Sequence, residues 1–269
     1  MVGARAHRSS LRALAALLAG AALGLVSCVA PPRSYPLERR LRVESVDYSG
    51  WDALLRSHVH DGVVNYPAFA SAPELGGFLE QVGAVELTAD TPPEQRLAFL
   101  INAYNALAVA AILDGGSPET LLGRHRFFQR ERHAVAGEEI TLWDLEHARI
   151  RPLGEPRIHF ALVCASASCP KLAAQAYRPG HLDDQLERDT LAFINDATRN
   201  RFDAGQRLAQ LSAIFDWYAE DFEASACSVP GYVAAYVDDP AIVPGLVDGR
   251  WQIEYMDYDW SLNGVAPAH

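Results

Sequence analysis

Residues 91–116 read TPPEQRLAFLINAYNALAVAAILDGG, and this stretch decides the fold. Its start, Thr91-Pro92-Pro93-Glu94, combines a capping box with proline in the first helical turn. The pair of glycines at its far end is typical of a helix stop. Because residues 97–113 are apolar on nearly every face, the sequence predicts a buried central helix over 92–113.

The segments on either side of this helix mix helical and extended patterns. Further helices are expected at 51–60, 141–149, 182–198 and 212–222, and strands or extended segments at 157–164, 207–211 and 252–262. Helix predominates and the strands are few, so the sequence predicts an α+β fold, a mainly helical single domain with a small β-sheet.

The N-terminus has the pattern of an export signal. Arg5, Arg8 and Arg12 precede an apolar run over 14–26, which ends in Leu25-Val26-Ser27-Cys28. This pattern predicts a lipoprotein signal peptide over 1–27, with cleavage before Cys28 and lipid attached to that cysteine. The alternative is a plain secretory peptide in which Cys28 is incidental.

The expected organisation after cleavage is a tether followed by one domain. Residues 28–47 contain Pro31, Pro32 and Pro36 and are interpreted as a lipidated tether; residues 48–264 are interpreted as the folded domain. The expected location is the bacterial cell envelope, on the outer membrane facing the periplasm, with the membrane as a partner through lipid on Cys28.

The charge of the chain limits its partners further. Cleavage after Ser27 removes three arginines and no acidic residue, so the net charge changes from −11 to −14. A charge this negative argues against nucleic acid as a partner. A protein or small-molecule partner remains open, since no pattern in the sequence identifies one.

Several well-defined catalytic patterns are absent from the sequence. It contains no phosphate-binding glycine loop, no His-Glu-x-x-His helix, no Gly-x-Ser-x-Gly elbow and no dinucleotide glycine pattern. We therefore expect no cofactor, and the common nucleotide-binding and serine-hydrolase classes lose support.

Polar residues at apolar positions indicate a candidate pocket. Asn102 and Asn105 lie three positions apart on one face of the central helix, and Glu146 and His147 lie in the next helix. The asparagines either line a pocket or satisfy loop carbonyls, because a buried amide without partners costs roughly 1–3 kcal/mol. His147 is either a pocket residue or a core histidine, and Glu146 is expected to pair with an arginine such as Arg151.

The densest cluster of reactive side chains is RIHFALVCASASCP, residues 157–170. Four interpretations remain open: a Cys164–Cys169 disulfide, inert thiols, a catalytic Cys169 with His159 as its base, and a metal site. Metal binding has the weakest pattern, since two cysteines and one histidine on opposite strand faces make a poor ligand set, and no metal is predicted.

The catalytic interpretation depends on local geometry. In a strand over 157–164, His159 faces away from Cys164. Cys169 would then lie in a loop before Pro170, which is placed to open a helix, and a thiol at a helix N-terminus ionises more readily. Disulfide formation and cysteine catalysis exclude each other unless the disulfide is redox-active.

Six blocks occur in an order that resembles a known family, domain of unknown function 547. They are FLINAYNAL (99–107), LWDLEH (142–147), RIHFALVC (157–164), SCP (168–170), FDWY (215–218) and YDWSLN (258–263). The resemblance covers about residues 51–263. This chain has Leu100 where the family usually has tryptophan and Val163 where it usually has asparagine. The resemblance implies relatives without implying a reaction.

Two functional hypotheses follow. The favoured one is a membrane-anchored envelope lipoprotein of undefined activity whose domain binds or scaffolds without catalysis. The alternative is a cysteine-dependent hydrolase or amide transferase with Cys169 as nucleophile and His159 as base.

Overall fold

The computed structural model describes residues 40–267. The predicted signal peptide and the lipidation site at Cys28 lie outside the described residues. The predicted tether is too long at its C-terminal end: β1 (Leu41–Arg42) pairs in parallel with β4 (Val85–Glu86), and the 3-10 helix η2 (Val43–Ser45) follows. Val43 and Val46 are buried, so the folded part begins before residue 48 because these valines belong to the core.

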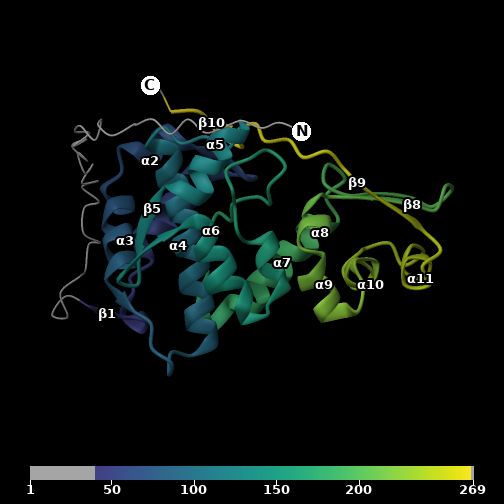
Figure 1. The fold of residues 1–269 in the computed structure, drawn as a ribbon, viewed down its shortest axis with the longest axis horizontal. Coiled ribbons are helices and arrows are strands. Elements are labelled where there is room, and N and C mark those ends of the chain that lie inside the picture. The colour runs from purple at the N-terminus through teal and green to yellow at the C-terminus, as the bar shows by residue number, and fades with distance from the viewer. Residues whose placement is uncertain (1–39, 268–269) are drawn as a thin grey trace, which may run out of the picture. The chain divides into compact units, whose positions relative to one another are not determined.

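The predicted central helix is confirmed as α4 (Pro93–Leu113), which is buried on almost all sides. Pro92 takes the N-cap position, and Thr91 Oγ1 accepts a hydrogen bond from the Thr88 amide instead of capping the helix. α4 is long and apolar enough to cross a membrane, but most of its apolar stretch is packed inside the domain. It is therefore the core helix of the part of the domain that contains α2 (Tyr66–Ala70), α3 (Pro73–Ala84) and α6 (Leu142–Asp144) (Figure 1).

The N-terminal helices pack against α4. They are α1 (Ser49–His58), α2 (Tyr66–Ala70) and α3 (Pro73–Ala84). The fully buried Trp51 stacks on Phe78 with ring centroids 5.8 Å apart, and its indole N–H donates to Asn102 Oδ1 at 3.3 Å. One large cluster of apolar side chains thus joins these helices to the middle of α4.

Strands in the described part of the chain are short and form several small sheets. The pairings join β10 (Gly264–Val265), β3 (Val63–Asn65) and β2 (Val59–His60); β5 (Arg132–Val135) and β6 (Glu138–Thr141); and β7 (Arg201–Asp203), β8 (Leu208–Leu211) and β9 (Gln252–Tyr255). β8 and part of the extended C-terminal segment were expected from the sequence. The mainly helical α+β class is confirmed.

The helical segments after α4 are shorter and more irregular. They are α5 (Leu121–His125), η3 (Arg126–Arg130), α6 (Leu142–Asp144), η4 (Leu145–Ile150), η5 (Arg151–Leu153), η6 (Pro156–Phe160), η7 (Pro179–His181), α7 (Leu182–Ile194), α8 (Ile214–Trp217), α9 (Ala219–Ala226), α10 (Val229–Ala234) and α11 (Val243–Val247). α7 ends earlier than predicted, and the helix expected over 212–222 is interrupted at Tyr218. A second apolar cluster, which includes Phe160, Phe215 and Phe222, joins α7 to α11.

The strand predicted over 157–164 is wrong. Residues Pro156–Phe160 form the 3-10 helix η6, and 161–164 continue without regular structure. The backbone of residues 161–163 forms hydrogen bonds with the side chain of Asn105 and not with a neighbouring strand. Asn105 donates to Ala161 O at 2.9 Å and accepts from the Val163 amide at 2.9 Å. The expected helix after Pro170 is also absent over residues 170–175, so Cys169 does not lie at a helix N-terminus.

Candidate functional site

A cavity of about 320 Å³ opens where the two apolar clusters meet. Most of its walls are aromatic. Its lining residues are Tyr104, Phe128, Trp143, Glu146, His147, His159, Leu162, Cys164, Cys169, Pro170, Ile214, Trp217, Tyr218, Tyr258 and Trp260. Four residues expected at a site thus come together here: Glu146, His147, His159 and Cys169.

Three aromatic rings form one wall. Trp217 lies in α8, and Tyr258 and Trp260 lie in the extended C-terminal segment. Their ring centroids are 4.7 Å apart for Trp217 and Tyr258, 4.5 Å for Tyr258 and Trp260, and 5.7 Å for the two tryptophans. The Arg124 guanidinium lies over the Trp260 ring, 4.3 Å from its centroid. The C-terminal segment is therefore part of the site and not a loose tail.

A second aromatic wall comes from the turn of helix that begins at Leu142. Thr141 caps this helix by accepting from the Asp144 amide at 3.1 Å, as its sequence pattern predicts. Trp143 and His147, one turn apart, stack with centroids 3.7 Å apart, and His147 Nδ1 lies 3.0 Å from the Trp143 carbonyl. Trp143 is 44% exposed, so its ring borders the cavity and solvent together.

Glu146 places a carboxylate in the buried wall of the cavity. The Tyr104 hydroxyl, from the middle of α4, donates to Glu146 Oε2 at 3.2 Å. Burial, reinforced by the neighbouring Glu146, raises the pKa of Tyr104 and of Tyr218 well above the ordinary value. Both phenols therefore remain protonated donors. The expected Glu146–Arg151 pair is wrong, because Arg151 bonds another carboxylate.

That carboxylate is Asp221, which links Arg151 to His159. Arg151 donates from Nε to Asp221 Oδ2 at 2.7 Å and from Nη2 to Oδ1 at 2.9 Å, and His159 Nε2 lies 2.7 Å from Oδ2. Partial burial alone would raise the pKa of Asp221, but the bonds from His159 and Arg151 outweigh it and hold the pKa well below the usual range.

This arrangement fixes the orientation of His159. The side chain is buried and stacks on Tyr218 with centroids 3.9 Å apart. Since Nε2 faces Asp221, Nδ1 is the ring nitrogen left for other chemistry. The geometry thus supplies an oriented histidine on the cavity wall.

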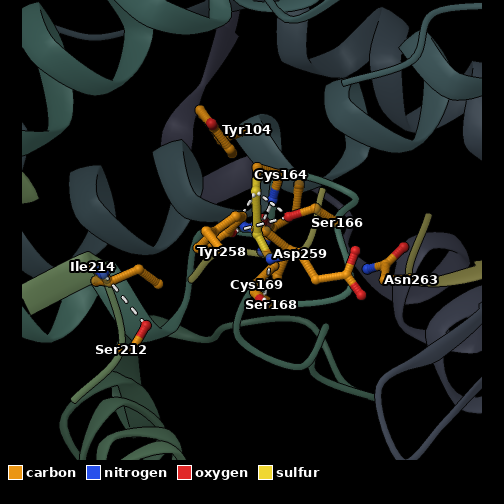
Figure 2. Close-up of a disulfide and its surroundings, with 12 residues drawn as sticks. Tyr104, Cys164, Ser166, Ser168, Cys169, Ser212, Ile214, Tyr258, Asp259 and Asn263 are labelled. Atoms are coloured by element: carbon orange, nitrogen blue, oxygen red, sulfur yellow. Dashed lines mark hydrogen bonds between the residues drawn. A yellow bond between two sulfur atoms is a disulfide. The ribbon is translucent and has the colours of Figure 1, made fainter. Parts of the chain in front are cut away.

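Cys164 and Cys169 form a disulfide that lies in the wall of the same cavity (Figure 2). Their Cα atoms are 6.2 Å apart. Cys164 is partly exposed, whereas Cys169 is buried. Of the four interpretations of this cluster, the structure supports the disulfide. In this state Cys169 carries no free thiol, so it cannot act as a nucleophile.

Hydroxyl groups surround Cys164 Sγ (Figure 2). Ser166 Oγ lies 3.1 Å and Tyr258 Oη 3.2 Å from this sulfur. Ser166 donates its one proton to Tyr258 Oη at 2.9 Å, so the Tyr258 proton is directed to Cys164 Sγ. Burial raises the pKa of Tyr258 to about 12, which keeps this donor protonated near neutrality.

Asn102 and Asn105 do not line the cavity. Asn102 donates to the carbonyls of Ala98 and Tyr177, both at 2.8 Å, and accepts from the Tyr177 amide at 3.0 Å. Asn105 bonds Ala161 and Val163, as described above. Both amides therefore hold loops against α4, which was the structural alternative for them.

Several residues of the site were not predicted from the sequence. Some of them lie in recognisable sequence blocks, and others do not. The aromatic blocks at 215–218 and 258–263 were visible as part of the family resemblance, and they supply Trp217, Tyr218, Tyr258 and Trp260. No local pattern marked Asp221 as the partner of His159. Among residues 40–267 no group of three or more His, Cys, Asp or Glu side chains could hold a metal ion.

Residues 88–194 match the family model described as "Protein of unknown function, DUF547". This segment is a DUF547 domain. The match covers α4, the helix of Glu146 and His147, and both cysteines of the disulfide. The cavity also uses side chains beyond the match, from Ile214 to Trp260. The DUF547 segment therefore builds one side of the site, and the C-terminal part of the chain completes it.

No curated protein and no solved structure matches the chain.

Proposed function

We propose that this protein is a lipid-anchored lipoprotein of the bacterial cell envelope, on the outer membrane facing the periplasm, and that its DUF547 domain binds a small ligand in the aromatic cavity. The anchor is supported by the sequence Leu25-Val26-Ser27-Cys28 after an apolar run. The binding role is supported by one observation above others, the aromatic cavity of about 320 Å³ with a buried carboxylate in its wall.

The lining of the cavity defines the class of ligand. Tryptophan and tyrosine rings favour an apolar or cationic body that stacks on them. Glu146 accepts hydrogen bonds and already holds the Tyr104 hydroxyl, so it favours a ligand group that donates, such as an amine or a hydroxyl. A small organic molecule with an apolar or cationic body and one donor group fits these walls.

The alternative, a cysteine-dependent hydrolase or amide transferase, is favoured by the paired His159 and Asp221 on the same cavity wall as Cys169. A histidine oriented by a carboxylate is the usual partner of a nucleophilic cysteine. This activity requires a free thiol at Cys169, and the Cys164–Cys169 disulfide removes it. Binding without hydrolysis is therefore the better-supported function of the disulfide-bonded form.

Thermal-shift and tryptophan-fluorescence titrations of the full chain test this proposal with a panel of small amines, quaternary ammonium ions and sugars. Members of the panel that bind should raise the melting temperature and change the emission, since three tryptophans line the cavity. Trp143→Ala should weaken binding about tenfold through loss of one stacking wall.

Tyr255→Ala is the matched control. Tyr255 is 42% exposed, close to the 44% of Trp143, and does not line the cavity. A panel member bound by the wild type and by Tyr255→Ala, but weakly by Trp143→Ala, supports the cavity as the binding site. Equal affinity in all three proteins, or no binding by the wild type, contradicts the proposal.

A further inference from the structure

We propose that the Cys164–Cys169 disulfide is redox-active and exchanges with a small thiol that enters the aromatic cavity. The inference rests on the proposed function, because the thiol reaches the disulfide through the cavity in which the ligand binds. Beyond ligand binding, the inference assigns a reaction to the cavity, which is thiol–disulfide exchange, and a class of reactant, which is a low-molecular-weight thiol.

The two sulfur atoms are placed unequally, which gives the exchange a direction. Both cysteines line the cavity, but Cys164 is partly exposed and Cys169 is only 3% exposed. An incoming thiolate therefore reaches Cys164 Sγ first. Attack must be in line with the breaking bond, so Cys169 Sγ becomes the leaving group.

Each sulfur also has a hydrogen-bond donor aimed at it. The Cys164 backbone N–H donates to Cys169 Sγ at 2.8 Å, and the Tyr258 hydroxyl is directed to Cys164 Sγ at 3.2 Å. The sulfur of a disulfide accepts weakly, whereas a thiolate accepts strongly. These donors thus stabilise the reduced pair more than the oxidised pair, which favours a disulfide that opens readily.

The loop between the cysteines is held without the disulfide. The amides of Ala167 and Ser168 donate to the carbonyls of Ser261 and Asp259 at 2.6 and 3.0 Å, and Ser168 Oγ accepts from the Asp259 amide at 2.9 Å. In addition, the Asn263 amide donates to Ala165 O at 3.1 Å. The C-terminal segment therefore fixes the loop, so opening the disulfide leaves its backbone contacts in place.

The backbone of this loop stores strain next to Cys164. Ala165 has φ of +61°, a left-handed conformation that costs an alanine free energy. The stabilisation of a fold by a disulfide grows with the length of the loop that it closes, so a disulfide with a purely structural role more often closes a long loop. Cys164 and Cys169 are separated by only five positions. The strained backbone and the short loop both favour a redox role for this disulfide over a structural one.

The reaction has two steps that balance. In the first, the thiolate RS⁻ attacks Cys164 Sγ; an RS–Sγ bond forms, the Sγ–Sγ bond breaks, and its electron pair leaves on Cys169 Sγ. In the second, another RS⁻ attacks the sulfur of the bound R group, which releases RSSR and a thiolate on Cys164. The two RSH molecules each release one proton when they form RS⁻, and these two protons can protonate the two cysteine thiolates. The disulfide is reduced by two electrons and the small thiol is oxidised.

Equilibration of the full chain in glutathione buffers tests the proposal. The probe is reduced and oxidised glutathione at varied ratios without denaturant, followed by alkylation and mass measurement of the Cys164–Cys169 peptides. We expect complete conversion to the dithiol in excess reduced glutathione, with far-UV circular dichroism unchanged. Reduction only together with loss of that signal would overturn the proposal.

Tyr258→Phe tests the role of the hydroxyl donor. Loss of one hydrogen bond to a charged acceptor should lower the equilibrium constant for reduction by glutathione about tenfold. Tyr255→Phe, three positions earlier and outside the cavity lining, should leave it unchanged. An equal constant in Tyr258→Phe and wild type would contradict the assignment of this donor.

Variants that keep only one cysteine of the Cys164–Cys169 pair test the order of attack in a Cys227→Ser background, because Cys227 is an exposed free thiol. With oxidised glutathione, Cys169→Ser should form the mixed disulfide on Cys164 at least tenfold faster than Cys164→Ser forms it on Cys169. Equal rates would overturn the assignment of Cys164 as the attacked sulfur.

Exchange without binding of any panel ligand would contradict the proposed function alone; ligand binding without exchange would contradict this inference alone.

Discussion

His159 and Asp221 are joined by a 2.7 Å hydrogen bond across 62 positions of the chain. The bond ties η6 to α9, and the bidentate contact from Arg151 adds η5 to the same junction. One carboxylate therefore orients the cavity histidine and holds three elements together.

Asp221→Asn should lower the free energy of unfolding by about 2 kcal/mol at neutral pH, because it weakens charge-assisted bonds to Arg151 and His159. The effect should depend on pH. The pKa of Asp221 is lower in the folded protein than its ordinary value of about 3.9 in the unfolded chain. Its stabilisation is thus complete well above pH 3.9 and is lost as the pH falls toward the folded pKa.

Denaturant unfolding between pH 7 and pH 3 measures this difference. The difference in unfolding free energy between wild type and Asp221→Asn should be constant near neutrality and should begin to shrink as the pH falls below about 3.9. Asp216→Asn, at an exposed position of α8, is the control and should match the wild type at pH 7. A constant gap between wild type and Asp221→Asn at every pH would rule out this role for the carboxylate.

Asn102→Leu should lower the free energy of unfolding by about 2–4 kcal/mol, because it leaves the amide and carbonyl of Tyr177 without partners in the core. Gln95→Leu, on the same helix and with no comparable contacts, should change it by less than about 0.5 kcal/mol. Thermal melting distinguishes the two. A melting temperature of Asn102→Leu equal to that of Gln95→Leu would refute the structural role of this amide.

Gly264→Ala should destabilise the protein by more than removal of the disulfide does. A Cβ atom at residue 264 would collide with the backbone of Val64, its partner in the β10–β3 pair. The C-terminal segment that holds the 164–169 loop would then be displaced. The Cys164→Ser/Cys169→Ser double variant should lose about 2 kcal/mol, as expected for a loop this short.

Chemical denaturation compares these variants, with Gly76→Ala as control. Gly76 lies in α3 with open space around its Cβ position, so alanine should be neutral or stabilising by up to about 1 kcal/mol. A smaller loss in Gly264→Ala than in the double cysteine variant would show that the disulfide, and not the C-terminal segment, holds the loop.

Cys28→Ala should move the exported protein from the membrane fraction to the soluble fraction or leave it uncut. Loss of the lipidated cysteine removes the anchor that stable membrane attachment needs. Cell fractionation with Cys227→Ala as the matched control checks this, because that substitution also replaces a cysteine with alanine but should not alter the distribution. Identical fractionation of both variants would refute lipid anchoring through Cys28.

The fold was predictable where local signals and tertiary packing agree. The proline start, the apolar length and the glycine stop of residues 91–116 identified α4 correctly, and Thr141 identified the next helix. The segment 157–164 failed for a physical reason. Its apolar residues are compatible with a strand or with any buried segment, and its backbone bonds Asn105 from α4, which no local pattern reveals.

The site was predictable in part for the same reason. Side chains close in the chain, such as Glu146 with His147 and His159 with Cys169, were found from composition and spacing. Asp221 escaped because its importance comes from a contact across 62 positions. The asparagines of α4 were recognised as buried, but burial alone does not distinguish a pocket wall from a loop anchor.

If the protein is exported as we propose, the apolarity of α4 has a consequence for its biogenesis. Machinery that inserts proteins into membranes reads each segment before tertiary structure exists, so a stretch this long and apolar competes for retention in lipid. Asn102 and Asn105, near its middle, make that retention costly because lipid offers their amides no partners. The same two residues that later anchor loops thus favour passage of the unfolded segment into water, and their replacement by leucine should increase its trapping in the bilayer.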